Sequence, residues 1–257
     1  MAKSKAEKSS STARREFVLS ETTPFAIKEA YKTARTNLVF SLASSDAKIV
    51  VVSSCAPSEG KSTNCLNLAI AMAETGASVL LIDSDLRKPV QHTMLLLENK
   101  TGLSTLLAGI SDDFSEIVNK DVYPKLDVLT SGSIPPNPAE LIQSARMDKL
   151  LENVGKHYDY IFIDTPPVNV VTDALLYSGR VSGIVFIVRE NHTTHVEINE
   201  AMKKASMTNA KILGFLKVGC SAGEKMGTGY KYKYKYKYNY YKYKDYSTTD
   251  HSDARSS

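Results

Sequence analysis

The stretch SSCAPSEGKST, residues 53–63, decides the fold of this 257-residue chain. It follows a run of β-branched residues, KIVVVSS (48–54), and opens a helical pattern over residues 61–74. A turn of small residues between a strand and a helix N-terminus can surround phosphate with backbone N–H groups. In such a loop Lys61 is predicted to reach the phosphate oxygens and Ser62 to ligate Mg²⁺.

The remaining loop residues complete the predicted phosphate contact. We expect the nucleotide to meet Pro57, Ser58, Glu59, Gly60, Lys61, Ser62 and Thr63. The usual pattern has glycine where this chain has Cys55. A cysteine beside phosphates and a helix N-terminus can have a lowered pKa and respond to oxidants, but we interpret Cys55 as a small residue tolerated in a turn.

Two later strands end in carboxylates. LLIDSDLRKP (80–89) places Asp83 and Asp85 just past one strand, and IFIDTPP (161–167) places Asp164 after another. Two residues apart in extended chain, Asp83 and Asp85 face the same way, toward the phosphate loop. One strand-end Asp would be interpreted as a helix cap or turn residue. Three such carboxylates in the correct order predict an ATP–Mg²⁺ site.

Apolar runs alternate with helical patterns along the chain. We expect strands over 48–54, 78–83, 126–131, 160–164, 183–188 and 211–216, and helices over 25–42, 61–74, 139–156 and 194–208. Runs that are apolar on both faces indicate strands covered on both sides, as in a parallel sheet with crossover helices. The predicted fold is therefore a doubly wound, mainly parallel α/β sheet of the P-loop NTPase type, with ligands at the carboxyl ends of the strands.

Charge divides the chain into a mildly acidic body and a basic tail. The net charge is +4, but residues 225–244 carry seven lysines and no acid, so the rest sums to 4 − 7 = −3. We expect a flexible basic arm over 1–20, a P-loop domain over 21–222 and a disordered tyrosine- and lysine-rich tail over 223–257.

Several function classes are not expected. No stretch approaches the ~18–20 apolar residues of a membrane helix, and the basic N-terminus lacks the apolar core of a signal peptide. Three cysteines form neither a disulfide framework nor a metal spacing, which favours a reduced, cytosolic environment. His192 and His195 are interpreted as helix-surface or capping residues, since two histidines alone do not make a zinc site. Five tyrosines are interpreted as packing residues of the body: Tyr31, Tyr123, Tyr158, Tyr160 and Tyr177.

These motifs resemble the bacterial tyrosine kinases of capsule and exopolysaccharide operons, and more narrowly the separate cytoplasmic kinase subunit of Gram-positive bacteria. The resemblance spans roughly residues 21–246 and rests on the phosphate loop, LLIDSDLRKP, IFIDTPP, GSIPPNPAELI (132–142) and the tyrosine-rich end. It implies an ATP- and Mg²⁺-dependent protein tyrosine kinase on the partition-ATPase-like branch of the fold. It also implies a role in regulating capsular or exopolysaccharide synthesis and export.

The resemblance assigns a role to each residue of the site. Lys61 and Ser62 would bind phosphate and Mg²⁺, and Asp83 and Asp164 would organise the metal. Asp85 would orient or deprotonate the attacking phenol. The implied catalytic set is Lys61, Asp83, Asp85 and Asp164, and the implied metal ligands are Ser62, Asp83 and Asp164.

The same resemblance implies roles for residues outside the phosphate loop. Arg87 belongs to the second nucleotide motif and is assigned to nucleotide binding. A helix motif, E-x-x-R-x-x-R, mediates ring-shaped oligomers in the family; here it is EAYKTAR, with Glu29 and Arg35 matching and Lys32 replacing an arginine. Lysine keeps the charge but loses the planar bidentate fork, which weakens the expected ring contact.

The tail is the expected substrate. Nine tyrosines would be phosphorylated by a neighbouring subunit: Tyr230, Tyr232, Tyr234, Tyr236, Tyr238, Tyr240, Tyr241, Tyr243 and Tyr246. At about −1.5 to −2 charges per phosphate, full modification would make the tail acidic and dissolve a dephosphorylated ring. The resemblance further implies an integral-membrane activator of the polysaccharide co-polymerase type, a cognate tyrosine phosphatase, and a cytoplasmic location at the inner face of the membrane.

Other interpretations stay open. The tail could bind single-stranded nucleic acid, form an edge strand or attract an anionic membrane, but it lacks arginine and no nucleic-acid fold accompanies it, so nucleic acid is not expected. A partition or septum-positioning ATPase shares all three carboxylates. Such ATPases usually carry a further lysine where this chain has Cys55-Ala56-Pro57. Lys217 and Val218 stand where relatives often have an Asn near the adenine, so base recognition is not predicted.

Overall fold

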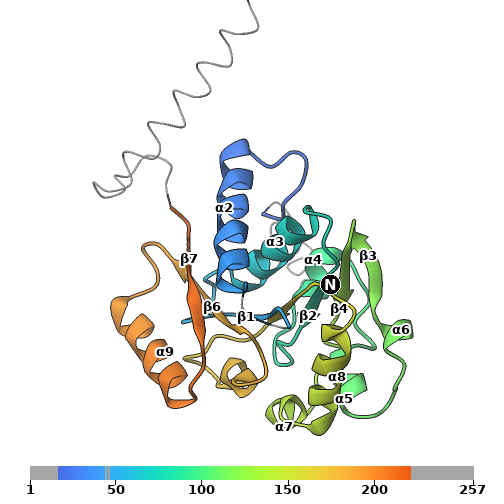
Figure 1. Ribbon diagram of the computed structural model, residues 1–257. Coiled ribbons are helices and arrows are strands. Elements are labelled where there is room, and N and C mark those ends of the chain that lie inside the picture. The colour runs from blue at the N-terminus through green and yellow to red at the C-terminus, as the bar shows by residue number, and fades with distance from the viewer. Residues whose placement is uncertain (1–16, 44, 46, 221–257) are drawn as a thin grey trace, which may run out of the picture. The chain divides into compact units, whose positions relative to one another are not determined.

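The computed structural model describes residues 17–43, 45 and 47–220, which form an alternating series of strands and helices (Figure 1). The strands are β1 Ile49–Ser54, β2 Val79–Asp83, β3 Asn119–Tyr123, β4 Leu126–Leu129, β5 Tyr160–Asp164, β6 Gly183–Arg189 and β7 Ile212–Val218. The helices are α2 Phe25–Ser41, α3 Lys61–Ala73, α4 Gln91–Leu95, α5 Leu103–Leu107, α6 Phe114–Ile117, α7 Pro138–Ile142, α8 Ala145–Gly155, the 3₁₀ helix η1 Asp173–Tyr177 and α9 His195–Met207.

The strands form one sheet in the order β3-β4-β2-β5-β1-β6-β7. Every neighbouring pair is parallel except β3 and β4, which are antiparallel. The doubly wound, mainly parallel sheet is therefore confirmed, with all six predicted strands present. The edge strand β3 was not predicted, because its sequence NKDVY is largely polar and each of its residues is partly or fully exposed, although Val122 and Tyr123 pack against the core.

Two hydrophobic cores lie on opposite faces of the sheet. Within β1, Val50 and Val52 pack toward α2 and α3, whereas Ile49 and Val51 pack toward the helices of the other face. That other face is covered by α5, α7, α8, η1 and α9 (Figure 1). Strands covered on both sides are nearly continuous apolar runs, and β1, β2 and β5 are buried along their whole length. Their polar residues stand only at the carboxyl ends.

Helix α3 is buried almost completely, and α2 provides the reason. Eleven residues of α3 are buried because the sheet covers one side and α2 covers the other. Residues before α2 also pack against α3. Val18 and Leu19 are buried, and Leu19 N donates to Asn67 Oδ1 at 2.8 Å. The folded body therefore includes residues N-terminal to residue 21.

The prediction of one helix over 139–156 is wrong in one respect. The structure divides this segment into α7 and α8 at residues 143–144. Ser144 has extended backbone geometry and its hydroxyl accepts from Met147 N, so it caps α8 and breaks the apolar periodicity between the two helices.

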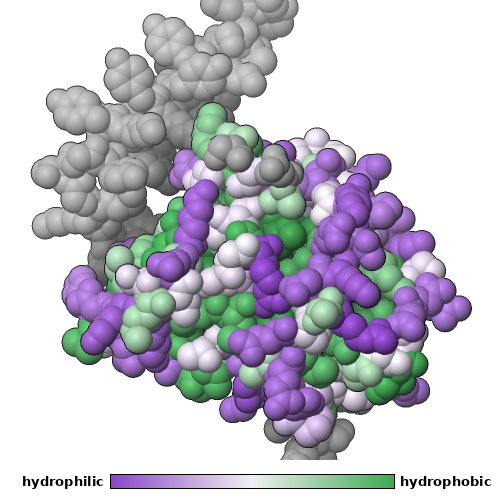
Figure 2. Space-filling model, turned by 60° about the horizontal axis from the view of Figure 1, so that its bottom comes forward, coloured by the Kyte–Doolittle hydropathy of each residue, from purple (hydrophilic) through white to green (hydrophobic). Residues whose placement is uncertain are grey.

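Hydrophilic and hydrophobic side chains are interspersed on the face of the molecule turned forward in Figure 2. No helix among the described residues is long and apolar enough to cross a bilayer.

The sheet order places the predicted site. β2, β5 and β1 are adjacent at the centre, so their carboxyl ends meet at one edge. The register pairs Asp83 directly with Asp164, and Val52 of β1 with the same Asp164. The phosphate loop leaves β1 at this edge and enters α3.

Candidate active site

The phosphate loop has the backbone geometry that its sequence predicts. Gly60 precedes α3 in the left-handed region, with φ of 84°, and Ser58 is also left-handed at 65°. A side chain at Gly60 would be strained there and would meet Asn64 Nδ2 at 3.1 Å. Asn64 Nδ2 donates to the Gly60 carbonyl at 2.8 Å. The loop thus delivers the N-terminus of α3, and with it a partial positive charge, to the carboxyl edge of the sheet.

A second segment, residues 189–193 at the carboxyl end of β6, contacts the loop from outside. Arg189 Nη1 donates to the Ser58 carbonyl at 3.1 Å, and His192 Nε2 lies 3.2 Å from the Pro57 carbonyl. The buried Glu59 carboxylate accepts from Ala56 N at 2.9 Å and from the Thr193 hydroxyl. Glu59 was predicted to meet nucleotide; in the structure both of its carboxylate oxygens are bonded to the protein that shapes the loop.

Lys61 joins the loop to the carboxylates. Its ammonium lies 2.9 Å from Asp85 Oδ2 and 3.5 Å from Asp164 Oδ1, and it donates to Ser62 Oγ at 3.1 Å. All three partners are buried. The sequence-predicted Lys61, Ser62, Asp85 and Asp164 are therefore brought together at one point.

Asp83 lies beside this group with a different set of partners. Its Oδ1 accepts from Asp85 N at 3.2 Å, and its Oδ2 accepts from Val90 N at 3.2 Å and Gln91 N at 3.0 Å. Both oxygens thus hold the segment that follows β2. Asp83 orders the turn that carries Asp85, a positioning task that spacing alone did not indicate.

Burial and mutual repulsion shift the ionisation of the cluster. Burial, followed by the charge of Asp164, raises the pKa of Asp83 to about 8. Burial also raises the pKa of Asp164, although Lys61 opposes this. For Lys61, burial by itself would lower the pKa, but Asp164 and Asp85 outweigh it and keep the pKa above its usual value. Lys61 therefore stays charged, whereas Asp83 and Asp164 keep their protons to a higher pH than exposed carboxyls do.

Gln91 is a buried member of the site that sequence reasoning missed. Its Nε2 donates to Asp164 Oδ2 at 2.9 Å and to the Ser62 carbonyl at 3.0 Å. Asp164 Oδ1 and Gln91 Oε1 are buried and accept no hydrogen bond in the described part of the chain. The only sequence signal for a role of Gln91 in the site is its position six residues after Asp85.

The fit to Mg²⁺ depends on these oxygens. Mg²⁺ prefers oxygen ligands and usually keeps waters and phosphate oxygens in its shell, so one or two protein ligands suffice. Ser62 Oγ and Asp164 Oδ1 satisfy that need, because both lie beside Lys61 and the Asp164 oxygen accepts no other bond. No group of three His, Cys, Asp or Glu residues within the described ranges could hold a metal ion by itself. The site fits a metal that arrives with phosphate.

Arg87 does not contact the loop in the described residues. Its Nε donates to Asp173 Oδ2 at 2.7 Å and its Nη2 to Asp173 Oδ1 at 2.9 Å, a bidentate pair with a buried carboxylate. Arg87 itself is about two-fifths exposed, at 39% of its side chain. Asp173 was not predicted, since it is the first residue of the 3₁₀ helix η1 and does not lie at a strand end.

The helix motif on α2 is partly used within the chain. Lys32 Nζ lies 3.0 Å from Glu29 Oε1, one turn away on the same helix. Arg35 Nη1 donates to the Ala71 carbonyl at 2.7 Å, in the last turn of α3. Tyr31, which precedes Lys32 on the same helix, donates to Asn64 Oδ1 at 2.7 Å. α2 is thus tied to α3, the helix that begins at the phosphate loop.

The remaining predictions near the site have clear outcomes. Cys55 is fully buried, and its burial, with the charges of Glu59 and Glu197, raises the pKa of the thiol to about 12, so it is a packing residue of the turn.

His195 begins α9, which Thr194 caps through Glu197 N. The five body tyrosines are buried or partly buried. Lys217 forms an ion pair with Glu190 at the carboxyl ends of β7 and β6. The nine predicted phosphorylation sites lie outside the described residues.

Comparisons with known proteins agree with this geometry. The chain matches the AAA domain family over residues 47–197. It is 39% identical over 202 residues to the tyrosine-protein kinase YwqD of Bacillus subtilis, covering 79% of this chain and 85% of that relative. It is 36% identical over 188 residues to the putative tyrosine-protein kinase CapB of Staphylococcus aureus, covering 73% of this chain and 82% of that relative.

Solved structures show the same relationship. The chimerical protein CapA2B2 matches with a TM-score of 0.71 at 38% identity, covering 76% of this chain and 85% of that one. The kinase domain of the Escherichia coli tyrosine kinase ETK matches with a TM-score of 0.71 at 30% identity, covering 78% and 80%. A plasmid partition protein of Borrelia burgdorferi matches with a TM-score of 0.54 at 19% identity, which shows the shared fold alone.

Proposed function

Because this chain belongs to the bacterial tyrosine kinases, an ATP-using family, we propose that the carboxyl edge of β1, β2 and β5 is its catalytic site. One observation carries the proposal. Lys61 lies 2.9 Å from Asp85 and 3.5 Å from Asp164, at the loop that opens α3. A partition-type switch without kinase activity is not favoured, since the partition likeness extends only to the fold.

Lys61 and Asp85 exchange partners in this proposal. With Lys61 bonded to Asp85, the carboxylate is neutralised and cannot take a proton efficiently. Phosphate oxygens at the N-terminus of α3 compete for the Lys61 ammonium and release Asp85. The freed Asp85 accepts the proton of the substrate tyrosine hydroxyl as the phenol oxygen bonds to the γ-phosphorus of ATP. The bond from that phosphorus to the bridging oxygen breaks at the same time, and ADP is the leaving group.

Ser62, Asp164 and Gln91 form the proposed Mg²⁺ side of the site. ATP supplies the transferred phosphoryl group, and Mg²⁺ neutralises charge that develops on its oxygens. Ser62 Oγ and Asp164 Oδ1 would hold the metal, directly or through water, and Gln91 Nε2 fixes the other Asp164 oxygen at 2.9 Å. Asp83 keeps the turn from β2 to Asp85 in place through its three backbone bonds.

The C-terminal tyrosines are the proposed substrate, phosphorylated by a neighbouring subunit. Nine tyrosines stand between Tyr230 and Tyr246, and seven lysines accompany them over 225–244. Full phosphorylation adds roughly −14 to −18 charges and reverses the sign of the tail. Like-charged tails repel one another, which would open an oligomer that forms through α2. Lys32 in place of arginine, and the use of Arg35 on Ala71, leave that contact weaker than in an E-x-x-R-x-x-R helix.

The proposed biological setting is the regulation of capsular or exopolysaccharide synthesis and export. An integral-membrane activator of the co-polymerase type would hold the kinase at the inner face of the membrane, and a tyrosine phosphatase would reset the tail. The fusion of two components in the chimerical protein CapA2B2, 38% identical to this chain, supports a search for such an activator.

Mass spectrometry tests the proposal. The full chain would be incubated with ATP and Mg²⁺, with and without the cytoplasmic tail of the candidate activator, and compared with Lys61→Met. Phosphate on residues 230–246 that is absent in the variant is the expected result. Replacement of all nine tail tyrosines by phenylalanine should also abolish the change in oligomeric state.

The opposite result is equally informative. ATP hydrolysis with unmodified tyrosines, activator present, would contradict tail phosphorylation and favour a nucleotide switch. Phosphorylation that persists in Lys61→Met would contradict the assignment of the site rather than the activity.

A further inference from the structure

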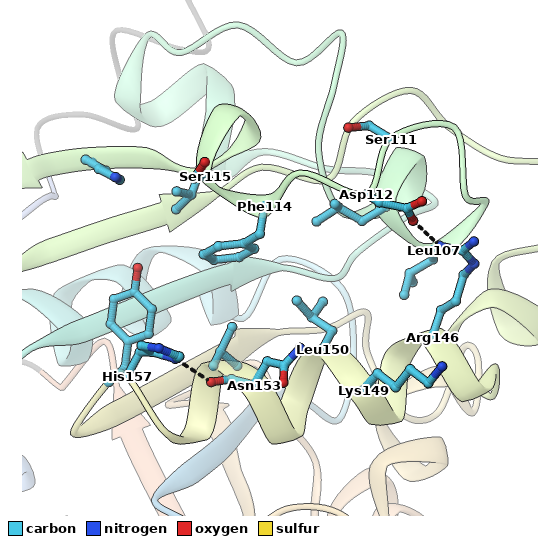
Figure 3. Close-up of a pocket in the computed structure, with 15 residues that line it drawn as sticks. Leu107, Ser111, Asp112, Phe114, Ser115, Arg146, Lys149, Leu150, Asn153 and His157 are labelled. Carbon is cyan, nitrogen blue, oxygen red and sulfur yellow. Dashed lines mark hydrogen bonds and ion pairs between the residues drawn. The ribbon is translucent and has the colours of Figure 1, made fainter.

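A cavity on the far edge of the sheet from β7 has no part in the phosphate site. It has a volume of about 680 Å³ and lies between α8 on one side and the α5–α6 connection with β3 on the other (Figure 3). That size is typical of a pocket for a small ligand or one anchoring side chain. No residue of the phosphate loop and none of the three strand-end carboxylates lines it.

Its floor is apolar. In Figure 3, Phe114 extends from the α6 side and Leu150 rises from α8 toward it, with Leu107 beside them. Val118 and Val154 complete the floor. Phe114 and Leu150 are only partly buried although they pack against the core. An aromatic ring laid on this floor would remove apolar surface from water, which favours an aromatic anchor.

The rim is cationic. Three cationic side chains line the pocket, Lys120, Arg146 and Lys149, against one carboxylate, Asp112. Arg146 Nη1 lies 2.5 Å from Asp112 Oδ1, whereas neither lysine has an ion pair in the described part of the chain. Arg146 and Lys149 are three residues apart and so lie on one face of α8.

Hydroxyl and imidazole groups add further polar contacts around the rim. Ser111 and Ser115 lie on the α5–α6 side, and His157 lies beyond the end of α8 with its Nδ1 2.8 Å from the Asn153 carbonyl. The pocket therefore joins an apolar, ring-sized floor to a rim that attracts anions. A ligand that fits both parts carries an aromatic ring and a multiply charged oxyanion on the same group.

We propose that this pocket binds phosphotyrosine of the chain's own C-terminal segment, residues 230–246, and so retains the tail after the reaction. The proposal rests on the proposed function, which supplies the phosphate. Charge makes the binding depend on phosphorylation. Seven lysines make the unmodified tail basic, and a basic rim repels it. Each phosphate adds about −1.5 to −2 charges and three acceptor oxygens for Lys120, Lys149 and Arg146.

The length of the tail permits this contact. The described chain ends at residue 220, and Tyr246 is 26 residues further on. An extended segment of that length spans up to about 90 Å, several times the width of ~29 Å expected for a seven-stranded sheet. The tail can therefore reach the pocket of its own chain or of a neighbour.

Fluorescence anisotropy with synthetic peptides tests the proposal without relying on kinase activity. The full chain carrying Lys61→Met, which keeps its own tail unmodified, would be titrated into a labelled peptide of residues 228–247 with phosphotyrosine at Tyr238 and Tyr240. We expect binding that is at least tenfold tighter than for the unmodified peptide and that weakens with salt. Lys120→Ala with Lys149→Ala should weaken it at least tenfold, and Leu150→Glu should abolish it.

Controls separate the pocket from other binding modes. Lys156→Ala removes a cation at the C-cap of α8, outside the pocket, and should leave binding within twofold. Thermal unfolding would show that each variant remains folded. Equal affinity for a peptide with glutamate at the same two positions would overturn the proposal in favour of general acidic docking. Loss of binding on adding ADP, with no effect of the pocket variants, would overturn it by placing the peptide in the nucleotide site.

Discussion

Two regions of the molecule gather charged side chains in opposite ways. At the phosphate loop, Lys61, Asp83, Asp85 and Asp164 are buried, and each has partners within the protein. In the α8 pocket, Lys149 and its neighbours are exposed around an apolar floor (Figure 3). In the first arrangement the charges are paired within the protein before a ligand arrives, and in the second the cations of the rim await an anionic ligand.

Burial explains the difference. In a low dielectric, charges interact strongly and their positions are fixed, so the loss of one member leaves the others uncompensated. Exposed charges are screened by water and salt, and their single contributions are small and nearly additive. The buried group suits catalysis, which needs preorganised charge, and the exposed group suits reversible binding.

The largest effect is expected from Lys61→Met. Because it removes the cation that meets both phosphate and the buried acids, we expect the rate of tail phosphorylation to fall by about 10³-fold. The measurement is the initial rate of phosphotyrosine formation at saturating ATP. Lys156→Met, the same change at the exposed residue that follows α8, should leave the rate within twofold. Similar losses in both variants would contradict the contrast between the two regions.

Asp85→Asn should have the next largest effect on activity. The amide still accepts from Lys88 N, which Asp85 Oδ1 now does at 2.9 Å, but it cannot take the phenol proton. We expect kcat to fall by about 10²- to 10³-fold with ATP affinity nearly unchanged. Kinetics together with nucleotide binding would separate the two. A variant that keeps its kcat but loses ATP affinity would show that Asp85 acts in binding and not as the base.

The pH dependence of stability tests the buried cluster directly. Burial and Asp164 raise the pKa of Asp83 to about 8, whereas its carboxyl in the unfolded chain titrates near 4. Between these values the folded state binds more protons than the unfolded state. The free energy of unfolding should therefore fall as pH rises, by about 1.4 kcal/mol per unit and with no further loss from this group above pH 8.

Denaturant titrations without nucleotide from pH 4 to pH 9 would measure this slope. Asp83→Asn cannot ionise and should flatten it. An unchanged slope in that variant would assign the retained proton to a different group.

The smallest effects are expected in the α8 pocket. Lys120→Ala and Lys149→Ala should each change the free energy of unfolding by less than about 0.5 kcal/mol, and the double variant should show the sum. Urea unfolding at low and high salt would measure both. Non-additive losses above about 1 kcal/mol would show that the pocket is a packed structural element.

Much of the fold was predictable, because parallel strands covered on both faces leave continuous apolar runs. β1, β2 and β5 are buried at every position and were predicted from such runs. β3 was missed because an edge strand has no such requirement and its residues are partly or fully exposed. The break between α7 and α8 was missed because the cap by Ser144 interrupts a pattern that otherwise continues.

The candidate site was predicted in part for the same reason. Strand-end carboxylates and a phosphate loop are local signals, and Lys61, Asp85 and Asp164 converge as expected. The residues that hold them in place were not predictable. Gln91 reaches an acid 73 positions away, and Arg87 pairs with Asp173 across 86 positions.

The sequence by itself determined six of the seven strands of the sheet, the phosphate loop and the carboxylates at the strand ends, because each follows from residues that are neighbours in the chain. The tertiary structure decided the partners. It assigned Glu59 to Thr193, Arg35 to Ala71 and Arg87 to Asp173, and it assembled the α8 pocket. The type of a side chain fixes which hydrogen bonds it can make, but its partner depends on which strands lie side by side in the sheet. The order of strands in the sheet follows from the need to bury both faces of the whole sheet at once.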